Sequence, residues 1–157
     1  MNNLVLILTW FHIFFVIGWF GSFLYTFFVL FPMLSKLSPQ SGKEFMFKLL
    51  PSHEFYSILF STGAIVAGIV LFLELYQMEG SVWFSHIMVG IVVGLAAYVL
   101  MLLSMSSMYK MRKGLKSIID NPQVFPPPPA KSMLYLLVIS FALLLIAMSF
   151  MVLAAAS

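Results

Sequence analysis

Residues 132–157 read SMLYLLVISFALLLIAMSFMVLAAAS, a run without a charged side chain. A helix needs about 20 mostly apolar residues to cross a hydrocarbon core of about 30 Å, so this run is long enough to span a membrane. Three further charge-free runs cover residues 1–35, 55–73 and 80–109. The first lacks the basic start and the small-residue cleavage site of a signal peptide, and we expect it to stay in the mature protein. The sequence therefore predicts four transmembrane helices, near residues 4–32, 53–76, 82–109 and 132–155.

The composition excludes a soluble fold. Of the 157 residues, 62% are hydrophobic and 8% are charged, and the mean hydropathy is +1.08, whereas soluble domains carry about 25% charged residues. Disordered chains and secreted disulfide scaffolds are excluded too, because the chain is rich in apolar residues and has no cysteine. Barrel strands would alternate apolar and polar residues, and these runs do not. We expect an all-α integral membrane four-helix bundle that forms one domain over residues 1–157.

The cations predict how the chain is oriented. All eight Lys and Arg residues fall in two predicted loops, 33–52 and 110–131, and short cytoplasmic loops carry the Lys and Arg excess of membrane proteins. We therefore expect a multi-pass plasma-membrane protein with cytoplasmic basic loops and both termini on the outer side. The net charge of +3 then reflects topology, and nucleic acid is not expected as a partner. The lipid bilayer is the expected partner, and a homo-oligomer is compatible with the sequence.

Two histidines lie within predicted spans, where an ionisable residue costs about 2.5–3.5 kcal/mol or more at mid-membrane. A rise of about 1.5 Å per residue places His12 about 12 Å from the outer end of the first helix and His86 about 6 Å from the outer end of the third. Imidazoles at similar depth on two helices are suited to face each other across one cofactor. Because a bis-His site between bundle helices is a common way to hold haem b, we predict His12 and His86 as metal ligands.

Two other ionisable residues lie near helix ends. His53 opens the second helix on the inner side, about 25 Å from the level of His12, so we expect an interfacial cap beside Glu54, with an inner-side ligand as the minor alternative. Glu74 ends the same helix at about the depth of His86. It either orients an imidazole, ligates a metal itself or marks the point where the helix meets water.

The surroundings of the two histidines suit a flat porphyrin, which needs bulky apolar walls and places where backbone approaches closely. Gly90 and Gly94 follow His86 at one and two turns. They are equally typical of plain helix packing, and the aromatic residues near His12 are equally typical of a lipid-facing surface. Those aromatic residues are Trp10, Phe11, Phe14, Phe15, Trp19 and Phe20.

Methionines offer a copper alternative. Met101, Met105, Met108 and Met111 form a stripe on the third helix, and thioethers bind Cu(I). The stripe lies at the opposite end from His12, which favours packing. Met88 is nearer, but it points to a different face of the helix from His86. The sequence contains no Gly-x-Ser-x-Gly, phosphate loop or cysteine nucleophile, which excludes the common hydrolase and nucleotide chemistries.

Residues 12–25 read HIFFVIGWFGSFLY, and residues 85–89 read SHIMV. A His followed about two turns later by Trp-Phe, a small residue and a Tyr resembles the first helix of the four-helix family of haem-binding protoporphyrinogen IX oxidases and copper-resistance D-like domains. The resemblance implies a haem b or metal site at His12, with His86 opposite and Tyr25 in the pocket. Those oxidases carry an Arg after the Tyr and a Lys two residues after the third-helix His, where this chain has Phe27 or Phe28 and Met88.

The sequence therefore predicts a haem b protein that transfers electrons on the outer side, with quinol or another outer-side redox partner. Trp19, Tyr25 and Gly90 would complete the pocket around the two histidine ligands. The alternative is a copper-binding or copper-transport protein that uses His12 and His86 with Glu74 or Met88. A protoporphyrinogen oxidase-like enzyme and a non-catalytic membrane subunit are the further alternatives.

Overall fold

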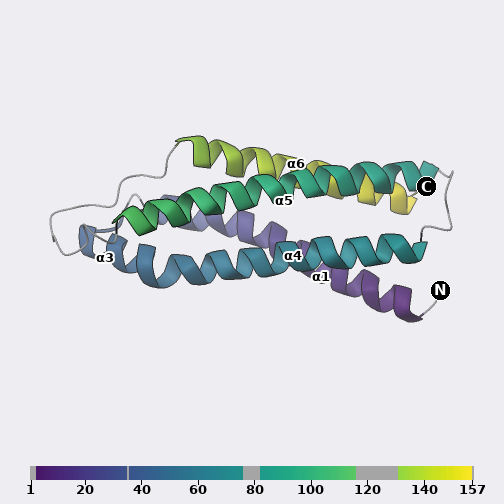
Figure 1. Cartoon of the computed structure of the whole chain (residues 1–157), viewed down its shortest axis with the longest axis horizontal. Coiled ribbons are helices and arrows are strands. Elements are labelled where there is room, and N and C mark those ends of the chain that lie inside the picture. Colours follow the sequence, from purple (N-terminus) through teal and green to yellow (C-terminus); the bar gives the residue numbers. More distant parts are fainter. Residues whose placement is uncertain (1–2, 35, 76–81, 116–130, 157) are drawn as a thin grey trace.

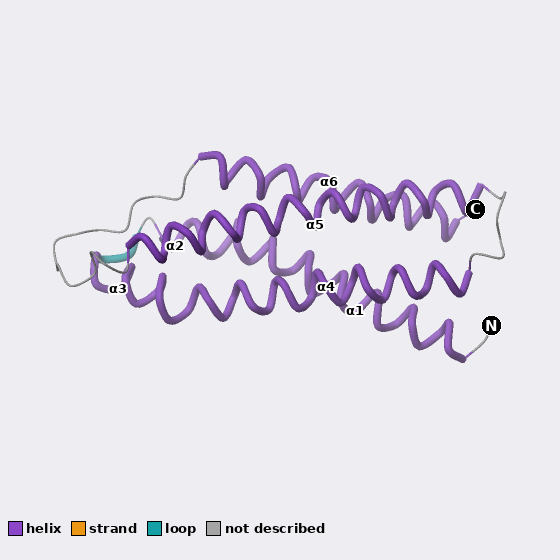
Figure 2. Tube along the Cα trace, in the orientation of Figure 1, coloured by secondary structure: helices purple, strands orange, loops and turns teal. Residues whose placement is uncertain are grey.

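A computed structural model describes residues 3–34, 36–75, 82–115 and 131–156, and all the regular structure in these ranges is helical (Figure 2). Four helices are long and apolar enough to cross a membrane, over Asn3–Met33, Phe47–Leu75, Phe84–Lys110 and Lys131–Ala154. The chain is thus a four-span helical membrane protein. Its elements are α1 (Asn3–Tyr25), the π-helix η1 (Thr26–Leu30), α2 (Phe31–Leu34), α3 (Pro39–Glu44), the π-helix η2 (Phe45–Leu49), α4 (Leu50–Leu75), α5 (Val82–Leu115) and α6 (Lys131–Ala156).

The second span belongs to a helix that starts earlier than the sequence predicts. Ser38 caps α3, since its hydroxyl oxygen accepts a hydrogen bond of 3.2 Å from the backbone N–H of Ser41, and Pro39 suits the first helical position. From there the chain is helical through η2 into α4. Most of the predicted loop 33–52 is therefore helical. The third helix continues past its predicted end at residue 109 as far as Leu115, and most of the predicted loop 110–131 lies outside the described residues.

Pro32 and Pro51 each follow a π-helical segment after one intervening residue. The backbone N–H of Phe31 bonds to the carbonyl of Thr26, and that of Leu50 bonds to the carbonyl of Phe45. A proline in a regular helix lacks an N–H and presses on the carbonyl four residues before it. The wider turn before Pro32 and before Pro51 relaxes that contact, so the chain stays helical past both prolines.

The helices pack as two pairs, α1 with α4 and α5 with α6 (Figure 1). In the α1/α4 pair, phenyl rings lie on glycines of the opposite helix. A Cβ at Gly18 would stand 2.3 Å from the ring of Phe60, and one at Gly63 would stand 2.5 Å from the ring of Phe15. Neither glycine leaves room for a side chain, so the two helix backbones approach closely.

The α5/α6 pair is held by a buried seam of small residues and hydroxyls. Ser140 donates a hydrogen bond of 2.7 Å to the carbonyl of Ala97, and Ser104 donates one of 3.3 Å to the carbonyl of Met133. The seam recurs every three or four residues, as in left-handed helix pairs. On α5 it comprises Gly90, Gly94, Ala97, Met101 and Ser104.

The distribution of apolar and polar side chains between surface and interior is the reverse of that in a soluble protein. Large apolar side chains point outward, such as Trp10 and Phe28, which are 67% and 74% exposed. Small hydroxyl residues are buried instead, among them Ser57 and Ser61. This distribution fits a surface that faces lipid, where helices associate through close packing and internal hydrogen bonds.

Figure 1 shows both chain termini at one end of the bundle, which we name the terminal end. It holds the start of α1, the end of α4, the start of α5 and the end of α6. The opposite, basic end holds α2, α3, the end of α5 and the start of α6. Every lysine and arginine in the described ranges lies in or beside these four basic-end segments, as the sequence predicts. Which end faces the cytoplasm stays a prediction.

Candidate functional site between the helix pairs

A cavity of about 40 Å³ lies between the two helix pairs, in the half of the bundle nearer the terminal end. All four long helices contribute to its wall. No lining residue is charged, and the only imidazole belongs to His12. Its lining residues are His12, Val16, Trp19, Ala64, Ile65, Gly68, Ile69, Gly90, Ile91, Gly94, Leu95, Leu144, Ala147, Met148 and Met151.

His12 is fixed in one tautomer by its hydrogen bond. Its Nδ1 lies 2.9 Å from the carbonyl oxygen of Ala64. A carbonyl can only accept, so Nδ1 carries the hydrogen and donates. In a neutral imidazole this leaves Nε2 with a free lone pair, which is the usual arrangement of a metal-ligating histidine whose second nitrogen is held by a backbone carbonyl.

Gly68 makes room for the His12 ring on α4. A Cβ at this position would stand 2.9 Å from Cε1 of His12 and 3.1 Å from Nδ1. Sequence reasoning missed both Ala64 and Gly68. The sequence does carry a signal for them, because small residues four positions apart on an apolar helix, as Ala64 and Gly68 are, are typical of a close helix contact.

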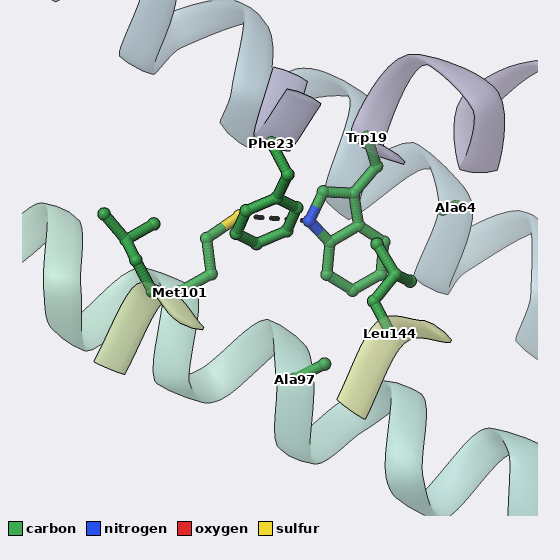
Figure 3. Close-up of a cluster of buried hydrophobic side chains, with 7 residues drawn as sticks. Trp19, Phe23, Ala64, Ala97, Met101 and Leu144 are labelled. Atoms are coloured by element: carbon green, nitrogen blue, oxygen red, sulfur yellow. Dashed lines mark hydrogen bonds between the residues drawn. The ribbon is translucent and has the colours of Figure 1, made fainter. Parts of the chain in front are cut away.

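Trp19 closes the cavity toward the basic end. Its indole is 2% exposed, and its Nε1–H donates a hydrogen bond of 3.2 Å to the sulfur of Met101 (Figure 3). Tyr98 meets the indole edge-on, with ring centroids 6.2 Å apart. Phe23 and Leu144 lie in the same buried cluster. The packing shields the cavity from water at this side and gives Met101 a core role.

The α5/α6 wall of the cavity is formed by small residues and methionines. Gly90, one of the predicted site residues, and Gly94 line it. The side chain of Met151 packs beside Gly90, where its Cγ would lie 3.4 Å from an added Cβ. Met148 lines the same wall. Sequence reasoning missed both methionines, although the spacing of Leu144, Met148 and Met151 places them on one helix face.

His86 lies one turn before Gly90 on α5, and it does not line the cavity. Its ring packs against Phe150 of α6, with centroids 6.2 Å apart. Its Nδ1 is buried and makes no hydrogen bond to the described part of the chain. The structure therefore brings His12, Trp19 and Gly90 to one cavity, with His86 beyond its edge.

The other predicted site residues lie elsewhere. His53 lies near the basic end, where its Nε2 is 2.9 Å from Oγ1 of Thr26 and its ring meets Tyr25 at 5.4 Å between centroids. Thr26 follows His12 by about 20 Å of helix, so Tyr25 and His53 are remote from His12. His53 bonds across to Thr26 of η1, whereas the sequence predicts a cap. Glu74 is exposed near the end of α4.

A buried ion pair joins the two helix pairs near the basic end. Arg112 on α5 donates a hydrogen bond to Glu54 on α4, and their side chains are only 10% and 12% exposed. The second carboxylate oxygen of Glu54 is buried and has no hydrogen-bond partner among the residues that the structure describes. In the described ranges, no three His, Asp or Glu side chains come together as metal ligands do.

Comparison with protein-family profiles, curated proteins and solved structures finds no match to this chain. The family resemblance of residues 12–25 and 85–89 therefore stays a prediction.

Proposed function

We propose that this membrane protein binds haem b between its two helix pairs, that His12 would hold its iron, and that it transfers electrons. The observation that carries the proposal is the hydrogen bond from His12 Nδ1 to the Ala64 carbonyl, which leaves the Nε2 lone pair of this cavity-lining residue free. Haem b, when bound, supplies one-electron chemistry as its iron cycles between two oxidation states.

The residues around His12 have separate roles in this proposal. The Ala64 carbonyl orients the imidazole and raises its basicity as a ligand. Gly68 allows the ring to reach that carbonyl. Trp19 and its packed neighbours keep water away from the basic-end side of the site, and a dry site is one of the means by which a protein sets a reduction potential.

The cavity of about 40 Å³ has room for only a few waters, since one water needs about 10–15 Å³ of cavity volume. A porphyrin is much larger. The closest packing runs within the α1/α4 pair and within the α5/α6 pair, so a planar ligand would enter by parting the pairs along the cavity. We expect this opening at the terminal end, because the Glu54–Arg112 ion pair joins the pairs near the basic end.

Copper binding is the second candidate function, and a specific observation favours it. The cavity presents two thioethers, from Met148 and Met151, beside the His12 imidazole and the Trp19 indole. Thioethers and imidazoles are ligands for Cu(I), and an indole face attracts cations. The present volume of about 40 Å³ suits a single ion.

The basic end would face the cytoplasm, because cations concentrate in cytoplasmic loops. The cavity would then lie nearer the outer side of the plasma membrane. Quinol or another outer-side redox partner would exchange electrons with the site there.

The test is a spectrum of the protein as isolated. The chain is expressed in haem-replete cells, purified in detergent and reduced with dithionite, and its iron and copper contents are measured alongside. A Soret band with a sharp α band and about one haem per chain is expected. Copper at one per chain without haem would select the second candidate, and a protein free of both metals would contradict the proposal.

A further inference from the structure

We propose that the basic end of the bundle binds anionic phospholipids through three exposed lysines, Lys110 and Lys113 of α5 and Lys131 of α6. The lysines hold the phosphate of the lipid headgroup, and the acyl chains of the same lipid lie on the apolar outer surface of α5 and α6. The proposal does not depend on the metal site at His12.

The packing of α5 against α6 brings the three lysines to similar depth. Two hydrogen bonds between these antiparallel helices, donated by Ser104 and by Ser140, fix one register. In that register Lys131 lies opposite position 106 of α5, about 6 Å along the helix axis from Lys110. Lys113 follows Lys110 by three positions, at which side chains on a helix are neighbours. The lysines thus occupy adjacent turns of two neighbouring helices.

The apolar surface of α5 and α6 ends before the lysines begin. Among the described side chains, Leu103 is the last exposed large aliphatic residue of α5 toward the basic end, and Val138 is the last one of α6. Lys110 and Lys131 each lie seven positions beyond, which is about 10 Å of helix. Both lysines therefore lie just outside the apolar surface, at the depth where lipid headgroups begin.

A tyrosine lies between the apolar surface and the lysine on each helix. Tyr109 is 61% exposed and Tyr135 is 66% exposed. Tyrosines gather where a membrane meets water, because the ring is apolar and the hydroxyl is polar. The two tyrosines mark the same headgroup level on α5 and on α6, independently of the lysines.

The three lysines have no acidic partner within the described part of the chain. Glu44 pairs with Lys48, and Glu54 pairs with the buried Arg112. The remaining carboxylate in the described ranges, that of Glu74, lies near the end of α4 at the terminal end. Like charges on adjacent turns repel each other, and a phosphate relieves that repulsion while it accepts hydrogen bonds from the ammonium groups.

The membrane itself supplies such a phosphate. Anionic lipids concentrate in the cytoplasmic leaflet, which is the leaflet that the predicted orientation gives to the basic end. A free phosphate would satisfy the charge of the lysines, but it would gain nothing from the apolar surface that adjoins them. The lipid satisfies both, so the surface fits a lipid headgroup better than a free ion.

The experiment titrates phosphatidylglycerol with a fluorescent acyl chain into the full chain in a non-ionic detergent, and fluorescence anisotropy reports binding. Phosphatidylglycerol is expected to bind more tightly than phosphatidylcholine with the same label, and added salt is expected to weaken its binding. Changing Lys110, Lys113 and Lys131 together to glutamine should lower the affinity for phosphatidylglycerol about 100-fold, because each lysine near a membrane surface contributes about 5-fold.

Three sets of variants make the result specific. Arginine at all three positions keeps the charge and should keep the affinity. Lys48→Gln removes a cation of the same end that already pairs with Glu44, and should lower the affinity less than Lys110→Gln does. The single variants Lys110→Gln and Lys131→Gln should each lose about 5-fold, which tests the surface without changing three charges at once.

Equal affinity for phosphatidylglycerol in the unaltered protein and in the glutamine variants would overturn the proposal. Equal affinity of the unaltered protein for phosphatidylglycerol and phosphatidylcholine would overturn it too, since the lysines would then read no charge. Inorganic phosphate that displaces the labelled lipid as effectively as unlabelled phosphatidylglycerol does would assign the lysines to a free phosphate instead.

Discussion

Two histidines, His12 and His53, each form a hydrogen bond between the first and second spans, and their surroundings differ. His12 gives its Nδ1 hydrogen to a backbone carbonyl and lines an uncharged cavity. His53 shares a hydrogen bond with the Thr26 hydroxyl near the basic end, close in sequence to the buried Glu54–Arg112 pair. The Thr26 hydroxyl donates its one hydrogen to the Ser22 carbonyl, so it accepts from Nε2–H of His53, and both imidazoles are held in one tautomer. The comparison teaches that the uncharged cavity distinguishes the candidate ligand from the structural histidine.

The largest expected effect comes from removing the two imidazoles in turn. His12→Ala should abolish haem or copper binding, because the cavity then holds no imidazole. His53→Ala should leave the spectrum and the metal content unchanged, since its ring lies about 20 Å of helix from His12. Absorption spectra and metal analysis of the purified His12→Ala and His53→Ala variants test these two predictions. Metal loss in His53→Ala alone would reverse the roles assigned to the two residues.

The next effect concerns the ion pair beside His53. Glu54→Ala leaves Arg112 buried without its carboxylate, and breaking a buried pair from one side costs about 3–5 kcal/mol. The cost of breaking the pair is measured as the decrease in the free energy of unfolding in mixed detergent micelles. The matched control is Lys48→Ala, which breaks the exposed pair with Glu44 and should cost less than about 1 kcal/mol. Equal costs for the two variants would refute the buried ion pair as a stabilising contact.

A smaller effect is expected from the glycine beside His12. Gly68→Ala places a methyl group 2.9 Å from Cε1 of His12, which should displace the ring from the Ala64 carbonyl. Loss of such an orienting contact weakens metal affinity by about 10–100-fold. Gly21→Ala is the matched control, because a Cβ there meets nothing within 4 Å. If titrations gave both variants the same affinity, Gly68 would have no part in orienting the ring.

The smallest effect is expected at the partner of His53. Thr26→Val removes the hydroxyl that bonds to His53, and such bonds between membrane helices are worth about 0.6 kcal/mol on average. Metal binding should not change. Thr9→Val is the control, since Thr9 bonds only to its own helix at Val5. A change in the haem or copper spectrum of Thr26→Val would couple the two histidine environments, which the structure keeps apart.

The four spans could be predicted from the sequence, because a long apolar run is a local property of the chain. His12 could be singled out for the same reason, as a polar group inside such a run. Its hydrogen-bond partner could not, since Ala64 lies 52 positions away. Predicting that contact requires knowing that α1 pairs with α4 through Phe15, Phe60 and their glycines.

The composition of the cavity wall was equally beyond the sequence. Methionine is common filler in apolar helices, so nothing local distinguishes Met148 from Met105. The helix within the predicted loop 33–52 was missed for a different reason. The π-turn Phe45–Leu49, which joins α3 to α4, has no simple sequence signature.

The most direct measurement is a titration of haem into the purified protein in detergent, with His12→Ala as the paired sample. The account predicts saturation at about one haem per chain, with a low-spin spectrum in the unaltered protein and no saturable binding in His12→Ala. Equal binding by both proteins would contradict the central claim that His12 holds the metal between the helix pairs.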